Sequence, residues 1–119
     1  MIHILIVSAD PLRAKVIALA LRNPSLAVRC IDPARCVIQE CQNWQVDLVI
    51  FLTLTPYFAS MNIVDEMRKK IDRVPQIYVI AQSHSQSTIL TLLECGVDQY
   101  MTFPLNLHRL RNKVYSLAH

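Results

Sequence analysis

The sequence predicts an α/β fold in which five strands form a parallel sheet with helices on both faces. Short apolar runs alternate with helical patterns along the chain, and this alternation is typical of parallel sheets with right-handed crossovers. The strongest run, residues 47–52, has five apolar residues out of six and is too short for a free-standing helix. It predicts a central strand buried on both faces. Chemistry in such sheets lies beyond the carboxyl ends of the strands, so we expect the functional question to turn on Leu52.

Size and composition indicate one domain with a single hydrophobic core. The chain has 119 residues, of which 53% are hydrophobic and 18% are charged. No apolar run reaches the roughly 18 residues that a membrane span needs. The first four residues lack the basic region and the cleavage site of a signal peptide. We therefore expect a cytoplasmic protein.

Start and stop signals define the elements of the first half. Residues 2–7 form an apolar run that predicts the first strand. Asp10-Pro11 combines a capping residue with a first-turn proline, so a helix should begin there and end at Asn23-Pro24. Residues 26–31 predict the second strand, and Asp32-Pro33 begins a second helix that runs to about Asn43. Trp44 is interpreted as a packing anchor. The apolar residues at helical spacing are Leu12, Val16, Leu19 and Ala20 in the first helix and Ala34, Val37, Ile38 and Cys41 in the second.

The second half repeats the alternation. Ile63, Val64, Met67 and Ile71 mark a third helix whose other face is charged, and residues 76–81 predict the fourth strand. A fourth helix, capped by Ser83 or Ser85, should end at Gly96 in the left-handed C′ position. Residues 98–102 predict a short fifth strand. The last helix carries an apolar stripe at steps of three, four and three residues, made of Leu107, Leu110, Val114 and Leu117.

The numbers and spacing of glycine, cysteine, histidine and basic residues argue against several kinds of binding site. Gly96 is the single glycine, so neither a dinucleotide-binding loop nor a Walker loop can form. The net charge of +3 is spread along several segments, which favours a solvated surface over a phosphate-binding stripe. No cysteine pair has CxxC spacing, so buried, reduced thiols are expected and a metal site is not. The cysteines are Cys30, Cys36, Cys41 and Cys95, and the scattered histidines are His3, His84, His108 and His119.

Four segments together resemble the receiver domain of bacterial response regulators over essentially the whole chain. They are residues 4–11, residues 47–52 with Pro56, residues 74–81, and residues 95–105, which contain the helix-end glycine, the fifth strand and a turn before Pro104. The resemblance implies a flavodoxin-like (βα)5 three-layer sandwich with strand order 2-1-3-4-5. Residues 1–119 would be one receiver-like domain. The sequence leaves open whether an output domain follows it or the domain stands alone.

The resemblance also implies that the phosphorylation site is degenerate. A working receiver holds Mg²⁺ with two acidic residues, accepts a phosphoryl group on an aspartate, and binds it with a hydroxyl and a lysine. These positions fall on apolar or small residues here, and shifting the alignment to Asp10 or Thr53 does not restore the chemistry. Phe103 could fill the vacated volume. The positions are Ser8 and Ala9 for the acidic pair, Leu52 for the phosphoacceptor, Ala81 for the hydroxyl, Phe103 for the lysine, and Tyr100 for the switch aromatic.

We therefore expect a phosphorylation-independent pseudo-receiver that is not an enzyme and needs neither cofactor nor metal. It would act in signal transduction or transcription regulation by binding a protein partner or a second copy of itself, without direct nucleic-acid or membrane binding. The family's usual surface corresponds to residues 85–94, 98–102 and 107–117. An alternative hypothesis is a small-molecule sensor that uses the vacated crevice. The polar candidates for the interface are Asp98, Gln99, His108, Arg109, Arg111 and Lys113.

Overall fold

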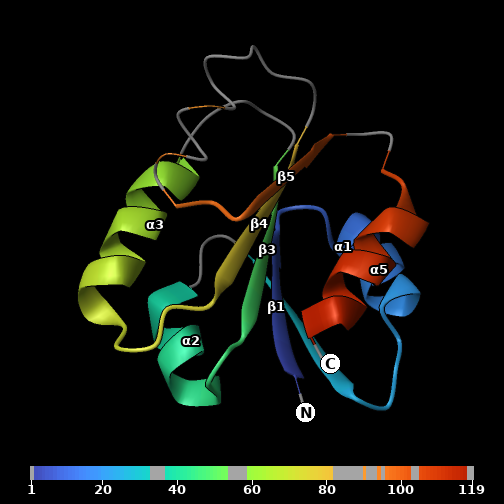
Figure 1. Cartoon of the computed structure of the whole chain (residues 1–119), viewed down its shortest axis with the longest axis horizontal. Coiled ribbons are helices and arrows are strands. Elements are labelled where there is room, and N and C mark those ends of the chain that lie inside the picture. The colour runs from blue at the N-terminus through green and yellow to red at the C-terminus, as the bar shows by residue number, and fades with distance from the viewer. Residues whose placement is uncertain are drawn as a thin grey trace.

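Five parallel strands form one sheet in the order β2-β1-β3-β4-β5. A computed structural model describes residues 2–32, 37–53, 59–81, 90, 94, 96–102 and 105–117. In Figure 1, α1 and α5 cover one face of the sheet, and α2 and α3 cover the other. The predicted flavodoxin-like sandwich and its strand order are confirmed. The strands are β1 (Ile2–Ser8), β2 (Leu26–Ile31), β3 (Leu48–Thr53), β4 (Gln76–Ala81) and β5 (Gln99–Thr102), and the helices are α1 (Pro11–Ala20), α2 (Val37–Trp44), α3 (Ala59–Lys70) and α5 (Leu107–Leu117).

The three central strands are apolar on both faces, as the unbroken runs predicted. Ile6 of β1 pairs in register with Ile50 of β3, which pairs with Tyr78 of β4. One hydrophobic cluster lies under α1 and α5 and includes Ile6, Ile50 and Ile80, all fully buried. The other lies under α2 and α3 and includes Leu5 and Val49. The sheet therefore separates two cores, and each pair of helices closes one of them.

Strand β3 begins at Leu48, one residue later than predicted, and Asp47 just before it makes side-chain contacts at the start of the sheet. Its Oδ2 accepts a hydrogen bond from the backbone N–H of His3 at 2.9 Å. Its Oδ1 lies 2.9 Å from a guanidinium nitrogen of Arg73. The carboxylate thus joins β1 to the segment before β4 at the amino edge of the sheet.

Helix α1 begins as predicted, but it buries a different face from the one that its most evident apolar spacing suggests. Asp10 Oδ1 accepts hydrogen bonds from the backbone N–H groups of Leu12 at 3.0 Å and Arg13 at 3.3 Å, which confirms the predicted cap. Ala14 and Ile17 face the sheet and are each 2% exposed. The apolar residues that indicated the helix lie on its outer side. These outer residues are Leu12, Val16 and Leu19.

The other helices bury the faces that their periodicity predicted. Val64 and Met67 of α3 are fully buried, and so are Leu110 and Val114 of α5. Gly96 has a φ of +109°, as expected of a left-handed residue after a helix. The predicted fourth helix lies outside the described residues, except that Leu90 and Glu94 are helical. Within the described part of the chain, no helix is both long enough and apolar enough to cross a membrane.

Trp44 is a packing anchor, as predicted. Its ring stacks on His3 with a centroid separation of 4.6 Å and an interplanar angle of 5°. The guanidinium of Arg29 lies 4.5 Å from the centroid of the same ring. The half-buried indole therefore holds the start of β1 and the middle of β2 against the end of α2.

The prediction of buried thiols is correct for Cys41 and wrong for Cys30. Cys30 is exposed because β2 lies at an edge of the sheet. Its thiol nevertheless lies 3.9 Å from the carbonyl oxygen of Ala14, and partial burial raises its pKa. Cys36 and Cys95 lie outside the described residues.

Candidate functional site

The carboxyl edge of the sheet brings together the positions that the receiver resemblance singled out. Ser8 at the end of β1 pairs in register with Leu52 of β3. Ala81 at the end of β4 pairs with Thr53 on one side and Thr102 on the other. The structure therefore places three of the five aligned positions on adjacent strand ends, as the alignment requires. Ala9 follows Ser8 in the turn before α1 and is exposed, and Phe103 lies outside the described residues.

These strand ends are buried, and two of their three residues are apolar. Leu52 is 8% exposed, Ala81 is fully buried, and Ser8 is 7% exposed. Neither Leu52 nor Ala81 carries a group that could accept a phosphoryl group or bind its oxygens. At the two positions that the resemblance aligns with the phosphoacceptor and the hydroxyl, the side chains are therefore hydrocarbon.

The polar groups in the turn after β1 are engaged with one another. The hydroxyl of Ser8 donates to the backbone carbonyl of Asp10 and accepts from its N–H, both at 3.0 Å. The carboxylate of Asp10 caps α1, and its Oδ2 lies 3.4 Å from Nε of Arg13. Asp10 is thus a structural cap, as its position before Pro11 predicted.

The described residues at this edge do not offer the set of oxygen ligands that Mg²⁺ needs. A hard cation needs several oxygen ligands, and the aligned acidic pair is Ser8 and Ala9. Among the side chains that the structure describes, no three His, Cys, Asp or Glu residues lie close enough to hold a metal ion.

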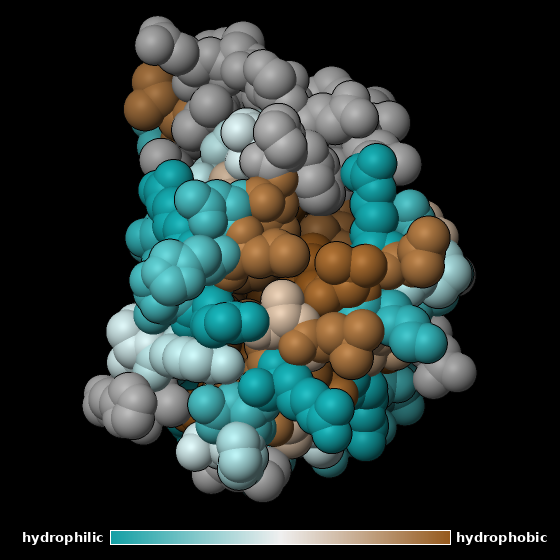
Figure 2. Space-filling model, turned by 90° about the vertical axis from the view of Figure 1, so that its right-hand side faces the viewer, coloured by the Kyte–Doolittle hydropathy of each residue, from teal (hydrophilic) through white to brown (hydrophobic). Residues whose placement is uncertain are grey.

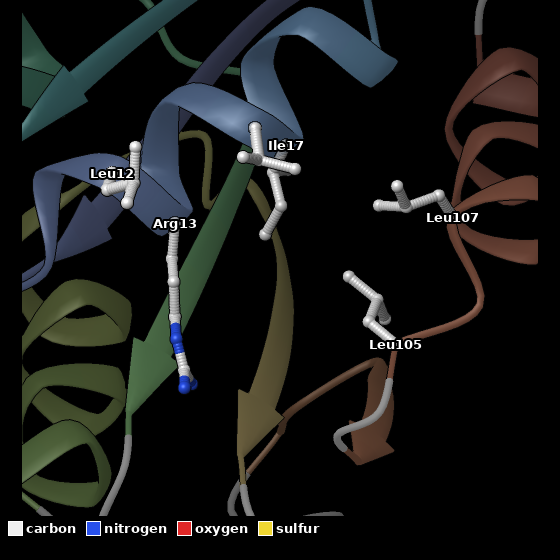
Figure 3. A pocket seen from close by; sticks show the side chains of 6 residues that line it. Leu12, Arg13, Ile17, Leu105 and Leu107 are labelled. Atoms are coloured by element: carbon white, nitrogen blue, oxygen red, sulfur yellow. The ribbon is translucent and has the colours of Figure 1, made fainter.

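Arg13 is the residue near this edge that the sequence reasoning missed. Its half-buried side chain extends from α1 in the direction in which β3 and β4 run (Figure 3). The guanidinium therefore places positive charge towards the carboxyl ends of β3 and β4. The spacing of Arg13 three residues after the helix cap Asp10, with which it pairs, is the signal that could have indicated this.

Comparison with solved structures shows that other proteins share this fold. No model of a known protein family matches the sequence. The receiver domain of a Francisella response regulator superposes with a TM-score of 0.83 at 16% identity, covering 99% of this chain and 97% of that one. An orphan response regulator of H. pylori gives 0.83 at 13% identity, with the same coverage. A pilus assembly protein, CpaE from Caulobacter crescentus, gives 0.75 at 23% identity, covering 98% of this chain and 99% of that one.

The chain has the receiver fold. This confirms the structural part of the resemblance, because each of these chains is matched over nearly its whole length. The likeness at these identities concerns the fold alone.

Tyr100, which the resemblance to receiver domains predicts as the switch aromatic, is half-buried. It pairs with Val79 in register and packs against the hydrophobic cluster under α2 and α3. Burial raises the pKa of its hydroxyl, so the ring is neutral at physiological pH.

Two of the charged interface candidates make contacts within the chain. Asp98 lies just before β5, and its Oδ2 accepts a hydrogen bond from the backbone N–H of Ile77 at 2.8 Å. Arg111 donates through Nε to the carbonyl of Ala20 at the end of α1, at 2.9 Å.

The remaining interface candidates lie on β5 and along α5. His108 and Arg109 are exposed, and Lys113 and Gln99 are half-buried. The predicted surface is thus described for β5 and α5, and residues 85–94 lie outside the described residues apart from Leu90 and Glu94.

Proposed function

We propose that this chain is a phosphorylation-independent receiver domain that acts in signal transduction by recognising another protein. The carboxyl edge of its sheet carries the proposal, because Leu52 and Ala81 stand where phosphoryl transfer would need an acceptor carboxylate and a hydroxyl. Phosphoryl transfer depends on positioning and charge neutralisation by several groups at once. Replacing the acceptor by leucine alone removes the reaction.

Recognition is the function that this scaffold retains when the phosphate chemistry is absent. A stable sheet with closed cores can still present helix and strand surfaces to a partner. The proposed surface comprises β5, α5 and the segment between β4 and β5, with Gln99, His108, Arg109 and Lys113 as polar contacts. Asp98 and Arg111 would contribute through the contacts that they leave available after their bonds to Ile77 and Ala20. The matched structures include response regulators and a pilus assembly protein, so the fold assigns no particular pathway.

Incubation with acetyl phosphate and Mg²⁺, followed by intact-mass measurement, tests the loss of phosphoryl transfer. We expect no mass gain, because Leu52 provides no acceptor. A receiver domain with a complete acidic site, treated in parallel, must gain one phosphoryl group to show that the reagent is active. A gain of one phosphoryl group on this chain would overturn the proposal.

Light scattering of the intact chain and of two charge-reversed variants distinguishes a second copy from a different partner. Arg111→Glu removes a cation that also holds α1, and Arg109→Glu removes an exposed cation on the same helix. A dimer that becomes monomeric in the Arg109→Glu variant would show self-recognition through α5. Monomers throughout would leave a different protein as the partner.

A further inference from the structure

A hollow opens at the amino edge of the sheet, between the ends of α2 and α3. Figure 1 shows both helices ending on the side where β3 and β4 begin. The hollow has a volume of about 380 Å³, which is within the range of small-ligand sites. Leu52 and Ala81 lie at the opposite ends of these strands, so the hollow is separate from the aligned phosphorylation positions.

The buried part of the lining is apolar. Cys41 of α2 and Val46 before β3 are each 4% exposed. Ile71 after α3 is half-buried and packs against the hydrophobic cluster under α2 and α3. Because all three residues line the hollow, a ligand gains by covering them with hydrocarbon.

A hydrogen bond between the two helices holds the walls of the hollow in place. Nε2 of Gln42 donates to the carbonyl of Lys70 at 3.1 Å, which joins α2 to the last residue of α3. The N–H of Ile71 donates to the carbonyl of Met67 at 2.9 Å, so the helical bonding continues past Lys70. A preformed site binds a ligand with less loss of conformational freedom than one that must form first.

Gln45 lines the hollow in a strained conformation. Its φ is +53°, and among the described residues it is the only non-glycine residue with a positive φ. It follows the end of α2, where the N–H of Val46 donates to the carbonyl of Cys41 at 3.4 Å. Glycine is the usual residue at such a helix end and adopts this φ without strain. A role in ligand binding would explain why the chain has glutamine there.

The exposed part of the lining carries charges of both signs. Lys70 and Asp72 are exposed, and neither side chain has an ion-pair partner in the part of the chain that the structure describes. Arg73 donates to Oδ1 of Asp47 at 2.9 Å and keeps further N–H donors. The hollow therefore combines cations, an anion and two amides with an apolar base.

This chemistry differs from that of the face formed by α1 and α5. Figure 2 shows apolar side chains gathered across the middle of that face. A broad apolar surface offers few groups that can orient a charged ligand. The hollow between α2 and α3 offers several such groups within the volume of one small molecule.

We propose that this hollow binds a free α-amino acid with an apolar side chain. Its carboxylate would meet Lys70 and Arg73, its ammonium would meet Asp72, and its side chain would cover the apolar lining. The amides of Gln42 and Gln45 can bond to either charged group, because an amide both donates and accepts. A zwitterion is favoured over a simple carboxylate or amine, because a ligand of one sign gains from only one kind of charge in the lining.

This inference goes beyond the proposed function, because it adds a small-molecule site at the edge of the sheet opposite the aligned phosphorylation positions. It requires neither phosphoryl transfer nor a protein partner, so its failure would leave the proposed function unchanged.

Amide chemical-shift titration of the ¹⁵N-labelled chain with L-leucine tests the inference. The matched probes are isocaproate, which is leucine without its ammonium group, and isoamylamine, which is leucine without its carboxylate. We expect leucine to give saturable shifts at residues 41–46 and 70–73, with a dissociation constant of about 1 mM. Each analogue should bind more weakly than leucine by about tenfold. Equal affinity for leucine and either analogue would overturn the proposal of a zwitterion.

Two further ligands and an inorganic ion complete the titration. L-valine and L-phenylalanine are titrated in the same way, and absence of saturation by all three amino acids below about 20 mM would overturn the site itself. Saturable binding of inorganic phosphate that displaces leucine would assign the hollow to an anion and would also overturn the proposal.

Two pairs of variants locate the site. Lys70→Gln and Asp72→Asn should each weaken leucine binding by about tenfold. Lys69→Gln and Asp65→Asn are the matched controls, because both residues are exposed on α3 and lie outside the hollow, and they should bind within about twofold of the original. Equal leucine affinity in all four variants would contradict the assignment to this hollow.

Gln45→Gly separates binding from stability. Glycine relieves the left-handed strain, so the urea midpoint should rise. Leucine binding should weaken by about fivefold, because a lining amide is lost. A variant that binds leucine as tightly as the original chain would contradict the part assigned to Gln45.

Discussion

Helices α1 and α3 cover opposite faces of the same sheet, but their outer sides differ. On α3, Val64 and Met67 are fully buried, while the residues between and after them are exposed and charged. On α1, apolar residues lie on both sides, with Ile17 buried and Leu12 and Leu19 exposed. The exposed charged residues of α3 are Asp65, Glu66, Arg68, Lys69 and Lys70.

This difference shows that the outer face of α3 is suited to contact with water, whereas the outer face of α1 is not. The outer face of α3 needs no partner, because its charged side chains are hydrated and form only weak, solvent-exposed ion pairs. The outer face of α1 leaves apolar surface in water, and burying it in a complex would release that cost. The free energy of unfolding should therefore depend on the inner faces of both helices and little on the exposed apolar residues of α1.

The largest expected effect separates inner from outer positions. Met67→Ala in α3 and Ile17→Ala in α1 should each lower the free energy of unfolding by about 2–5 kcal/mol, because each leaves a cavity in a closed core. Leu19→Ala should change it by less than about 0.5 kcal/mol, because Leu19 is mostly in solvent. Urea denaturation monitored by circular dichroism measures all three. If Leu19→Ala cost as much as Ile17→Ala, the outer stripe would be part of the core and the contrast with α3 would fail.

A smaller effect concerns how α1 begins. Asp10→Ala should lower the free energy of unfolding by about 1 kcal/mol, because the backbone N–H groups of Leu12 and Arg13 lose their acceptor. Asp10→Asn is the matched control, since its side-chain carbonyl can accept the same bonds, and most of the stability should return. Denaturant midpoints give both values. An equal loss in the two variants would show that the charge of Asp10 matters more than its capping geometry.

The core beneath α1 and α5 should also respond to alkaline pH through Tyr78. Burial raises the pKa of the Tyr78 hydroxyl above its ordinary value of about 10, and the nearby carboxylate of Asp98 raises it further. Because the folded pKa is the higher one, the stabilisation is complete below about pH 10 and is lost as the pH rises through the folded value. Tyr78→Phe should therefore flatten the fall in stability between about pH 9 and pH 11, leaving the part that Tyr100 contributes. An unchanged pH profile would show that Tyr78 ionises as freely in the folded chain as in the unfolded one.

The smallest effect tests the solvated face of α3. Lys69 Nζ lies 3.7 Å from Asp65 Oδ2, and both side chains are mostly exposed. Lys69→Ala should lower stability by less than about 0.5 kcal/mol, and a double-mutant cycle with Asp65→Ala should give a coupling of the same small size. A coupling above about 1 kcal/mol would mean that this face is ordered by its ion pairs, which would weaken the contrast with α1.

Much of the fold could be predicted because its local signals agree. Residues 26–31 and 76–81 were expected as strands, and the structure has them with the same bounds. Asp10 before Pro11 indicated the start of α1 because capping is a property of a few adjacent residues. The parallel order of the strands followed from the resemblance to receiver domains.

The features that could not be predicted depend on contacts distant in sequence. The pattern of Leu12, Val16 and Leu19 indicated a helix, but apolar residues on both sides of α1 conceal which side packs on the sheet. Asp98 bonds to the backbone of Ile77, 21 residues earlier, which no local motif reveals. For the candidate site, the sequence identified Leu52 and Ala81, but the direction of the Arg13 side chain is visible only in the structure.

Amide chemical-shift mapping of the ¹⁵N-labelled chain before and after addition of acetyl phosphate and Mg²⁺ tests independence from phosphate most directly. We predict that the amides of Ser8, Leu52 and Ala81 at the carboxyl edge of the sheet keep their positions, because neither Leu52 nor Ala81 can accept a phosphoryl group. Shifts of these amides that appear with the phosphodonor and Mg²⁺ but not with Mg²⁺ alone would contradict a phosphorylation-independent receiver domain.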